Sequence, residues 1–215
     1  MESPAASPSN PGNPGNPGNP SNPSNPALIV IDAQNGFEDA AFWGPRNNPQ
    51  ADANIAALLA RWRERGWPVV LVRHDSDNPA SPLFPGQPGH DFKDYVLAAG
   101  DAGSLSVANP AGLLVSKRVN SAFYGEPALE PWLRRNGLGT VVICGITTNH
   151  CCETTARMAG NLGFETFFAI DATHTFDRLS PSGETVSAQA LSDVTATNLH
   201  GEFAKVLGTR ELLGW

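Results

Sequence analysis

Cys151 lies at a predicted transition from a strand to a helix. Residues 141–143 are apolar and β-branched, which is typical of a buried strand. Gly145 breaks this run, small polar residues suited to a turn follow, and Cys151 begins the next helical segment. A thiol in the first turn of a helix is close to backbone N–H groups and to the positive end of the helix dipole. Because both favour the thiolate, the sequence predicts a lowered thiol pKa and a nucleophile at Cys151.

The alternative for Cys151 is an ordinary core position, because free cysteines are among the most buried residue types and most of them only fill space. Cys144 in the strand and Cys152 on the helix are expected to be of that kind. Three cysteines do not suggest a disulfide framework. A reactive thiolate suits a reducing compartment, so we expect a cytoplasmic protein.

Two charged residues also end strand-like runs. Asp32 closes the apolar run 27–31, and Lys117 closes the run 113–116. Strands and helical segments alternate along the chain, which predicts a mostly parallel sheet whose carboxyl ends share one edge. Ligands of open α/β sheets bind at that edge. Each residue alone is most simply a solvated loop residue, but together with Cys151 they predict a site.

These three residues can perform acyl transfer. The Asp32 carboxylate can accept the thiol proton and return it to a leaving amine or to water, while Lys117 favours the anionic forms of its neighbours. The Cys151 sulfur attacks a carbonyl carbon and forms a thioester-type intermediate. We expect the backbone N–H groups of Thr147 and Cys151 to stabilise the oxyanion. His150 is an alternative base, ranked below Asp32 because adjacent residues on a turn rarely point their side chains at each other.

Residues that follow the catalytic candidates are expected to form the walls of a substrate pocket. Aromatic side chains beside a nucleophile exclude water and stack on planar substrates, and neighbouring polar groups orient them. Ordinary packing is the alternative for each residue. The candidates are Gln34, Phe37, Trp43, Asn120, Phe123, Tyr124 and His150.

Three segments resemble the isochorismatase-like cysteine hydrolases, a family that includes nicotinamidases and N-carbamoylsarcosine amidohydrolases. They are IDAQNGF at 31–37, KRVNSAF at 117–123 and GITTNHC at 145–151, in the order and spacing of the family. The resemblance covers nearly everything from Ala27 onward. It implies an Asp-Lys-Cys triad, cleavage of a C–N bond in a small amide, carbamoyl or lactam-type compound, and a cis peptide bond between Ile146 and Thr147. It also implies an α/β fold, a three-layer α/β/α Rossmann-like arrangement with a mostly parallel central sheet of about six strands.

The metal site of nicotinamidases is the main departure from the family pattern. Those enzymes usually carry an Asp-x-His pair near the end of the second strand, where this chain has Val72 in place of the carboxylate. His90 is distant in sequence from His74 and lies in a Pro- and Gly-rich segment. One histidine without well-spaced partners is a poor metal site. We therefore expect no metal and no other cofactor, with His74 as a hydrogen-bonding wall of the substrate pocket.

Two other functions remain open at this point. A metal-dependent nicotinamidase would be distinguished by its metal content and by turnover of nicotinamide. A binding protein of the same fold that has lost catalysis would be distinguished by an unreactive Cys151. The presence of all three candidate residues favours the hydrolase.

The composition of the chain limits the kinds of partner that it can bind. The net charge is −7, and Lys and Arg are scattered, which argues against nucleic acid or an anionic membrane as a partner. No apolar run approaches the roughly 20 residues that span a bilayer. We expect a small-molecule substrate and assembly into a homodimer or homotetramer.

The chain divides into a tail and a single domain. Residues 9–26 repeat Asn-Pro with a period of three, and the first 26 residues cannot bury a core. A disordered tail is therefore expected over 1–26, followed by one hydrolase domain over 27–215. Residues 78–103 are rich in Pro, Gly and Ser and are expected to form a binding loop, a lid or a subunit contact. Hydrophobic patterning predicts further helices at 52–65, 127–135 and 187–200, and further strands at 68–73, 165–170 and 203–207.

Overall fold

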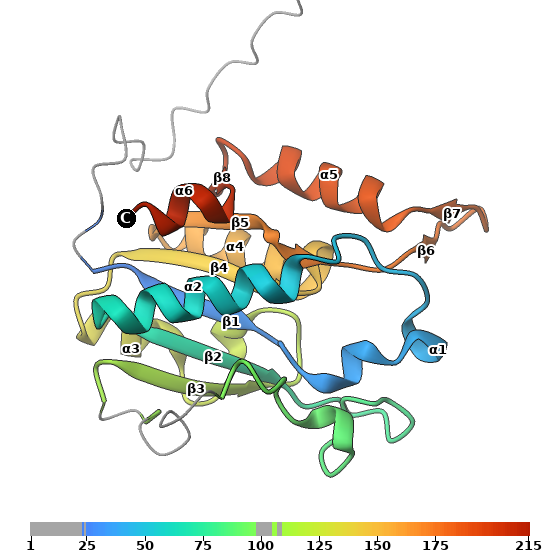
Figure 1. Cartoon of the computed structure of the whole chain (residues 1–215), viewed down its shortest axis with the longest axis horizontal. Coiled ribbons are helices and arrows are strands. Elements are labelled where there is room, and N and C mark those ends of the chain that lie inside the picture. The colour runs from blue at the N-terminus through green and yellow to red at the C-terminus, as the bar shows by residue number, and fades with distance from the viewer. Residues whose placement is uncertain (1–22, 24, 98–104, 107–108) are drawn as a thin grey trace, which may run out of the picture.

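The computed structural model describes residues 23, 25–97, 105–106 and 109–215. Its centre is a six-stranded sheet in the order β3-β2-β1-β4-β5-β8, in which every pairing is parallel (Figure 1). The expected α/β class and sheet size are confirmed. The strands are β1 (Ala27–Ile31), β2 (Val69–His74), β3 (Gly112–Lys117), β4 (Thr140–Ile146), β5 (Glu165–His174) and β8 (Lys205–Leu207).

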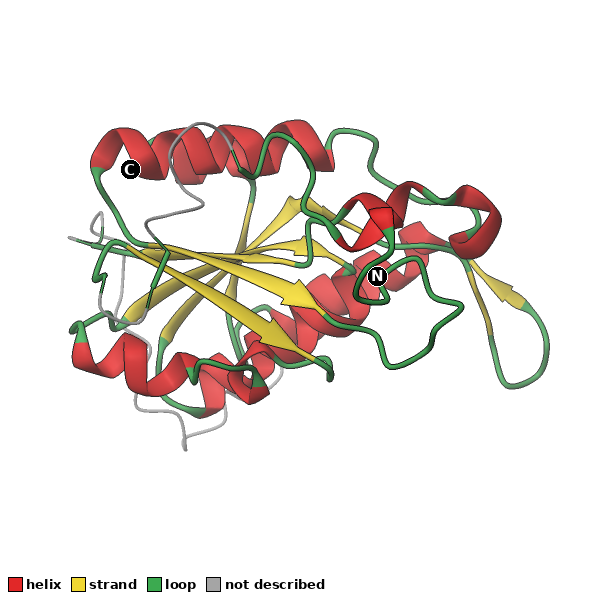
Figure 2. Cartoon of the chain, turned by 90° about the horizontal axis from the view of Figure 1, so that it is seen from below, coloured by secondary structure: helices red, strands yellow, loops and turns green. Residues whose placement is uncertain are grey.

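Helices cover both faces of the sheet and make the three layers (Figure 2). Alternate residues of β1 enter different cores: Leu28 packs with the residues of α2 and α6, whereas Ile29 packs with those of α3, α4 and α5. A strand between two helical layers is buried on both sides, which explains its unbroken apolar sequence. The helices are α1 (Ala40–Trp43), α2 (Ala51–Arg65), α3 (Leu129–Arg135), α4 (Glu153–Asn161), α5 (Ala188–Leu199) and α6 (Thr209–Leu213).

The chain after β5 differs from the sequence prediction. β5 runs to His174 instead of ending at residue 170, because its polar last third is held by tertiary contacts; the Asp171 side chain accepts hydrogen bonds from the backbone and hydroxyl of Thr209. A small hairpin of β6 (Arg178–Leu179) and β7 (Thr185–Val186) then projects beside the carboxyl edge (Figure 2). Two-residue strands have too little pattern to be found in a sequence.

Pro26, the last residue of the expected tail, contacts the domain. Pro26 is buried, and its carbonyl accepts a hydrogen bond of 2.8 Å from the indole N–H of Trp62. Most of the predicted tail, residues 1–22 and 24, lies outside the described residues, as do residues 98–103 of the predicted binding loop. No helix of the described part of the chain is long and apolar enough to cross a membrane.

Candidate active site

The three catalytic candidates meet at the carboxyl edge of the sheet. The ammonium Nζ of Lys117 lies 2.6 Å from Asp32 Oδ2 and 3.4 Å from Cys151 Sγ, and all three residues are buried. β1 lies between β2 and β4, so its end delivers Asp32 into the gap between the ends of the neighbouring strands. Residues that are 119 positions apart in the sequence thus form one contact group.

Asp32 has an unusual backbone conformation. Its φ of 49° is in the left-handed region, which few non-glycine residues adopt and which is enriched at functional sites. Its backbone N–H donates to the carbonyl of Val72 at 2.8 Å, which fixes the turn. Oδ2 contacts Lys117, whereas the buried Oδ1 has no hydrogen-bond partner among the described residues. The carboxylate therefore keeps one oxygen available to accept a proton.

β1 and β4 approach each other closely at the point where the chain leads to the nucleophile. Gly145 has φ 125°, and a Cβ at this position would lie 2.0 Å from the carbonyl oxygen of Ile31. The following bond, Ile146–Thr147, is cis, as the family resemblance implies. The chain then makes a π-helical turn, Thr148–Cys152, which runs directly into α4. Cys151 thus lies at the start of a helical segment, in a wider turn than a regular first turn.

The thiol of Cys151 is not acidified, which corrects the sequence-based expectation. Burial disfavours the thiolate, and the neighbouring Asp32 carboxylate adds to this, so the pKa of Cys151 is raised to about 12. Lys117 acts in the opposite direction but does not outweigh them. Burial also opposes the charge of Lys117, yet Asp32 and Cys151 raise the pKa of the ammonium above its ordinary value. The resting site therefore holds a protonated thiol beside an ammonium.

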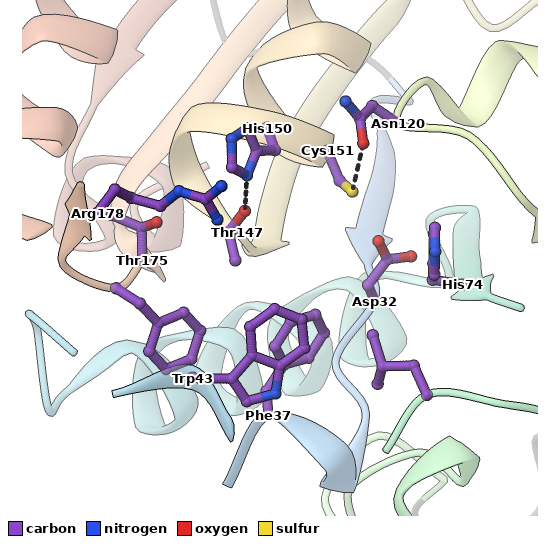
Figure 3. A pocket seen from close by; sticks show the side chains of 12 residues that line it. Asp32, Phe37, Trp43, His74, Asn120, Thr147, His150, Cys151, Thr175 and Arg178 are labelled. Atoms are coloured by element: carbon purple, nitrogen blue, oxygen red, sulfur yellow. Dashed lines mark hydrogen bonds between the residues drawn. The ribbon is translucent and has the colours of Figure 1, made fainter. Parts of the chain in front are cut away.

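A cavity of about 130 Å³ opens beside Cys151 (Figure 3). Asn120 lines it, and its Oδ1 accepts a long hydrogen bond of 3.8 Å from the thiol. Phe37, Trp43 and Phe176 form an aromatic wall, with ring centroids 4.9 to 6.2 Å apart. Predicted residues in the lining are Asp32, Phe37, Trp43, His74, Asn120, Thr147, His150 and Cys151.

Three of the expected pocket walls do not line this cavity. Gln34 is fully buried, and its amide binds the backbone of His74. Phe123 stacks on Phe164, with ring centroids 5.9 Å apart. Tyr124 is turned to solvent, with 70% of the residue exposed. Closeness in sequence to a catalytic residue did not place these side chains, because a turn after each strand sends successive residues in different directions.

Four lining residues were not anticipated from the sequence: Leu83, Thr175, Phe176 and Arg178. Leu83 comes from the segment that was expected to form a binding loop. Arg178 comes from the unpredicted hairpin and lies beside His150 in Figure 3. Burial, followed by the charge of Arg178, lowers the pKa of His150. The Nδ1 atom of His150 lies 3.4 Å from the hydroxyl of Thr147, which gives this histidine a partner other than the thiol.

The donor set at the catalytic centre does not fit a metal ion. Asp32, His74 and Cys151 offer ligand atoms within 4.8 Å of one another. However, the Lys117 ammonium lies among those atoms and contacts all three residues. The ammonium therefore occupies the place that a metal ion would need, between Asp32 Oδ2, His74 Nδ1 and Cys151 Sγ. His90 is paired elsewhere, with its Nε2 2.7 Å from Asp75 Oδ1.

Comparisons with known proteins agree with this geometry. The Isochorismatase domain family matches residues 26–199. The chain belongs to the isochorismatase family. The isochorismatase family protein YrdC of Bacillus subtilis is 39% identical over 187 residues, covering 87% of this chain and 94% of that protein. Nicotinamidase 3 of Arabidopsis thaliana is 33% identical over 198 residues, covering 87% and 89%.

The fold of this isochorismatase-family hydrolase also matches solved structures. A crystal structure of an isochorismatase family protein from Chromobacterium violaceum superposes with a TM-score of 0.78 at 40% identity, covering 88% of this chain and 92% of that one. The family match over residues 26–199 includes Asp32, Lys117 and Cys151.

Proposed function

We propose that this hydrolase is a cysteine amidase. It cleaves the C–N bond of a small amide, carbamoyl or lactam-type compound through a thioester on Cys151. The observation that carries the proposal is the buried Lys117 ammonium, which is hydrogen-bonded to Asp32 and to the Cys151 sulfur at the same time. The printed name of the Arabidopsis relative, a nicotinamidase, supports amide chemistry.

The raised thiol pKa determines the order of proton movements. Because the resting thiol is protonated, Asp32 takes its proton as the sulfur attacks the carbonyl carbon, and the open Oδ1 atom is the acceptor. Lys117 stabilises the negative charge that develops on sulfur. The substrate oxygen becomes an oxyanion, for which the backbone N–H groups of Thr147 and Cys151 are the proposed donors.

The second half of the reaction returns every group to its starting state. The tetrahedral intermediate collapses, the C–N bond breaks, and Asp32 gives its proton to the leaving nitrogen. A water molecule then loses a proton to Asp32 and attacks the thioester carbon. The C–S bond breaks, the sulfur recovers the proton from Asp32, and the carboxylic or carbamic acid leaves. The sum is one amide plus one water giving one amine and one acid.

A hydrolysis screen over small amides, carbamoyl compounds and lactams tests this function. Nicotinamide belongs in the screen because the aromatic wall of Phe37, Trp43 and Phe176 suits a planar ring. The expected result is turnover that survives a chelator, disappears in Cys151→Ala and persists in Cys152→Ala. The neighbouring Cys152 is a matched control because it is buried one residue away.

Mass spectrometry identifies the nucleophile independently of the best substrate. A slow substrate should leave an acyl group on the peptide that contains Cys151, and Cys151→Ala should abolish the adduct. An adduct on Cys144 or full activity in Cys151→Ala would overturn the assignment. Tight binding of an amide without turnover would instead indicate a binding protein of this fold, and turnover lost to a chelator would indicate a metal-dependent nicotinamidase.

A further inference from the structure

The Lys117 ammonium has a hydrogen-bond acceptor for each of its three protons. Besides Asp32 Oδ2 at 2.6 Å and Cys151 Sγ at 3.4 Å, it contacts the Nδ1 atom of His74 at 3.2 Å. The lysine side chain is fully buried. Inside a protein an unmatched ammonium proton is costly, so the ammonium needs this third acceptor.

Two features hold His74 in this position: the pairing of β2 with β3, and hydrogen bonds from Gln34 to the backbone of His74. In the parallel pairing of β2 with β3 it lies directly beside Lys117, so the two side chains share one face of the sheet. The amide of the buried Gln34 accepts from the backbone N–H of His74 at 2.8 Å and donates to its carbonyl at 3.1 Å. The same amide donates to the carbonyl of His90 at 2.8 Å. Gln34, two residues after Asp32, thus ties β2 to the catalytic turn.

The contact with Lys117 fixes the proton on the ring. An ammonium has no lone pair and only donates, so Nδ1 of His74 accepts and the ring proton is on Nε2. The charged groups that act on this ring are Lys117, Asp32, Asp75 and Asp77. Burial and then Lys117 lower its pKa, against the opposite effect of the three carboxylates. The ring is therefore a neutral acceptor at neutral pH.

We propose that His74 is a positioning residue of the catalytic triad, which holds the Lys117 ammonium between Asp32 and Cys151 through its Nδ1 atom. This inference rests on the Asp-Lys-Cys function proposed above. The attraction of the ammonium to a carboxylate exceeds its attraction to a neutral thiol, so without a third acceptor the ammonium shifts toward Asp32 and away from the sulfur. His74 keeps the cation where the thiolate will form.

NMR of the wild-type protein labelled with ¹⁵N-histidine reports the proton position on the native ring of His74. The expected signature is a protonated Nε2 and an unprotonated Nδ1 that persist from pH 8 down through the ordinary histidine pKa of about 6.5. The signal is assigned by its loss in His74→Asn. An Nδ1–H tautomer, or an imidazolium at neutral pH, would overturn the proposal.

Three substitutions separate the acceptor from the shape of the ring. In His74→Asn the amide oxygen can occupy the position of Nδ1, in His74→Gln it lies one atom further out, and His74→Leu has no acceptor. We expect Leu and Gln to slow alkylation of Cys151 by iodoacetamide about 10- to 100-fold and to raise its apparent pKa, the size expected for one lost hydrogen bond to a charged group. Asn should restore most of the rate.

The readout is the modified fraction of the Cys151 peptide over a range of pH, with circular dichroism spectra to show that each variant is folded. Equal rates in the Asn and Gln variants, or a wild-type rate in Leu, would contradict the role of Nδ1. Alkylation and NMR need no substrate. A failed hydrolysis screen therefore leaves this test intact, and a failure here leaves the amidase assignment to the screen.

Discussion

The two charged neighbours of the Cys151 thiol act on it in opposite directions. Asp32 raises the thiol pKa and Lys117 lowers it, and the balance together with burial keeps the resting sulfur protonated. Catalysis nevertheless needs both residues, one to accept the proton and one to stabilise the thiolate. Thiol ionisation and turnover can therefore be separated by changing one residue at a time.

Replacing Asp32 by Asn should make the thiol more acidic but the enzyme slower. The substitution removes a negative charge, so the pKa of Cys151 falls below about 12 and alkylation at a fixed pH of 8 becomes faster. Turnover should fall by about 10²–10⁴-fold, because the proton acceptor is lost. Iodoacetamide kinetics and steady-state rates check the two effects. Unchanged turnover would show that another group, such as His150, is the base.

Replacing Lys117 by Met should make the Cys151 thiol less acidic and the enzyme slower. Loss of the cation raises the thiol pKa further, so at each pH the thiolate fraction is smaller and alkylation is slower than in the wild type. The acidic limb of the pH–rate profile should shift to higher pH. Lys117→Arg should rescue only in part, since a planar guanidinium does not match three acceptors arranged around a compact ammonium. A thiol pKa that does not change would remove Lys117 from the triad.

At the scale of elements, the site depends on how closely β1 and β4 approach each other at their carboxyl ends. Gly145 is paired with Ile31 in the sheet, and its missing side chain allows the contact. The chain leaves this point through Ile146 and Thr147 into the turn that carries Cys151. A change at Gly145 therefore affects the position of the nucleophile as well as stability.

Gly145→Ala should destabilise the protein by about 2–5 kcal/mol, because the new Cβ collides with the Ile31 carbonyl and the residue has a positive φ. Gly139→Ala is the matched control: it is in the loop before β4, where an added Cβ meets nothing within 4 Å. It should change stability by less than about 1 kcal/mol. Urea denaturation of both variants measures the difference. Similar midpoints would show that the contact between Gly145 and Ile31 leaves room for a side chain.

At the scale of the whole molecule, one sheet with a core on each face accounts for the domain from Pro26 to Trp215. Residues before this point carry one charge and no aromatic side chain. A segment of this composition contributes little burial to the fold.

Deleting residues 1–24 should leave the melting temperature within about 2 °C of the full chain and leave turnover unchanged. The deletion keeps Pro26, whose carbonyl is the partner of the Trp62 indole. Differential scanning calorimetry and the rate on the best substrate provide the check. A fall of about 5 °C or more, which corresponds to roughly 1–2 kcal/mol, would mean that the segment packs on the domain.

The sequence by itself determined the six strands of the central sheet, their parallel arrangement and the three residues that meet at its carboxyl edge. These features depend on local patterns: apolar runs at β1, β3 and β4, each followed by Asp32, Lys117 or the turn before Cys151. A parallel sheet necessarily brings such ends to one edge, so the meeting of the three residues followed from the alternation of elements.

The tertiary structure alone decided the protonation of the thiol and which of the candidate residues line the pocket. The pKa of Cys151 depends on how much water is excluded and on the distance to Asp32, and both are set by residues distant in sequence. Gln34 turned inward to bind His74, Tyr124 turned to solvent, and Arg178 arrived on a hairpin too short to leave a pattern. A sequence specifies which side chains lie near an edge, but their directions and electrostatic surroundings exist only once the chain has packed.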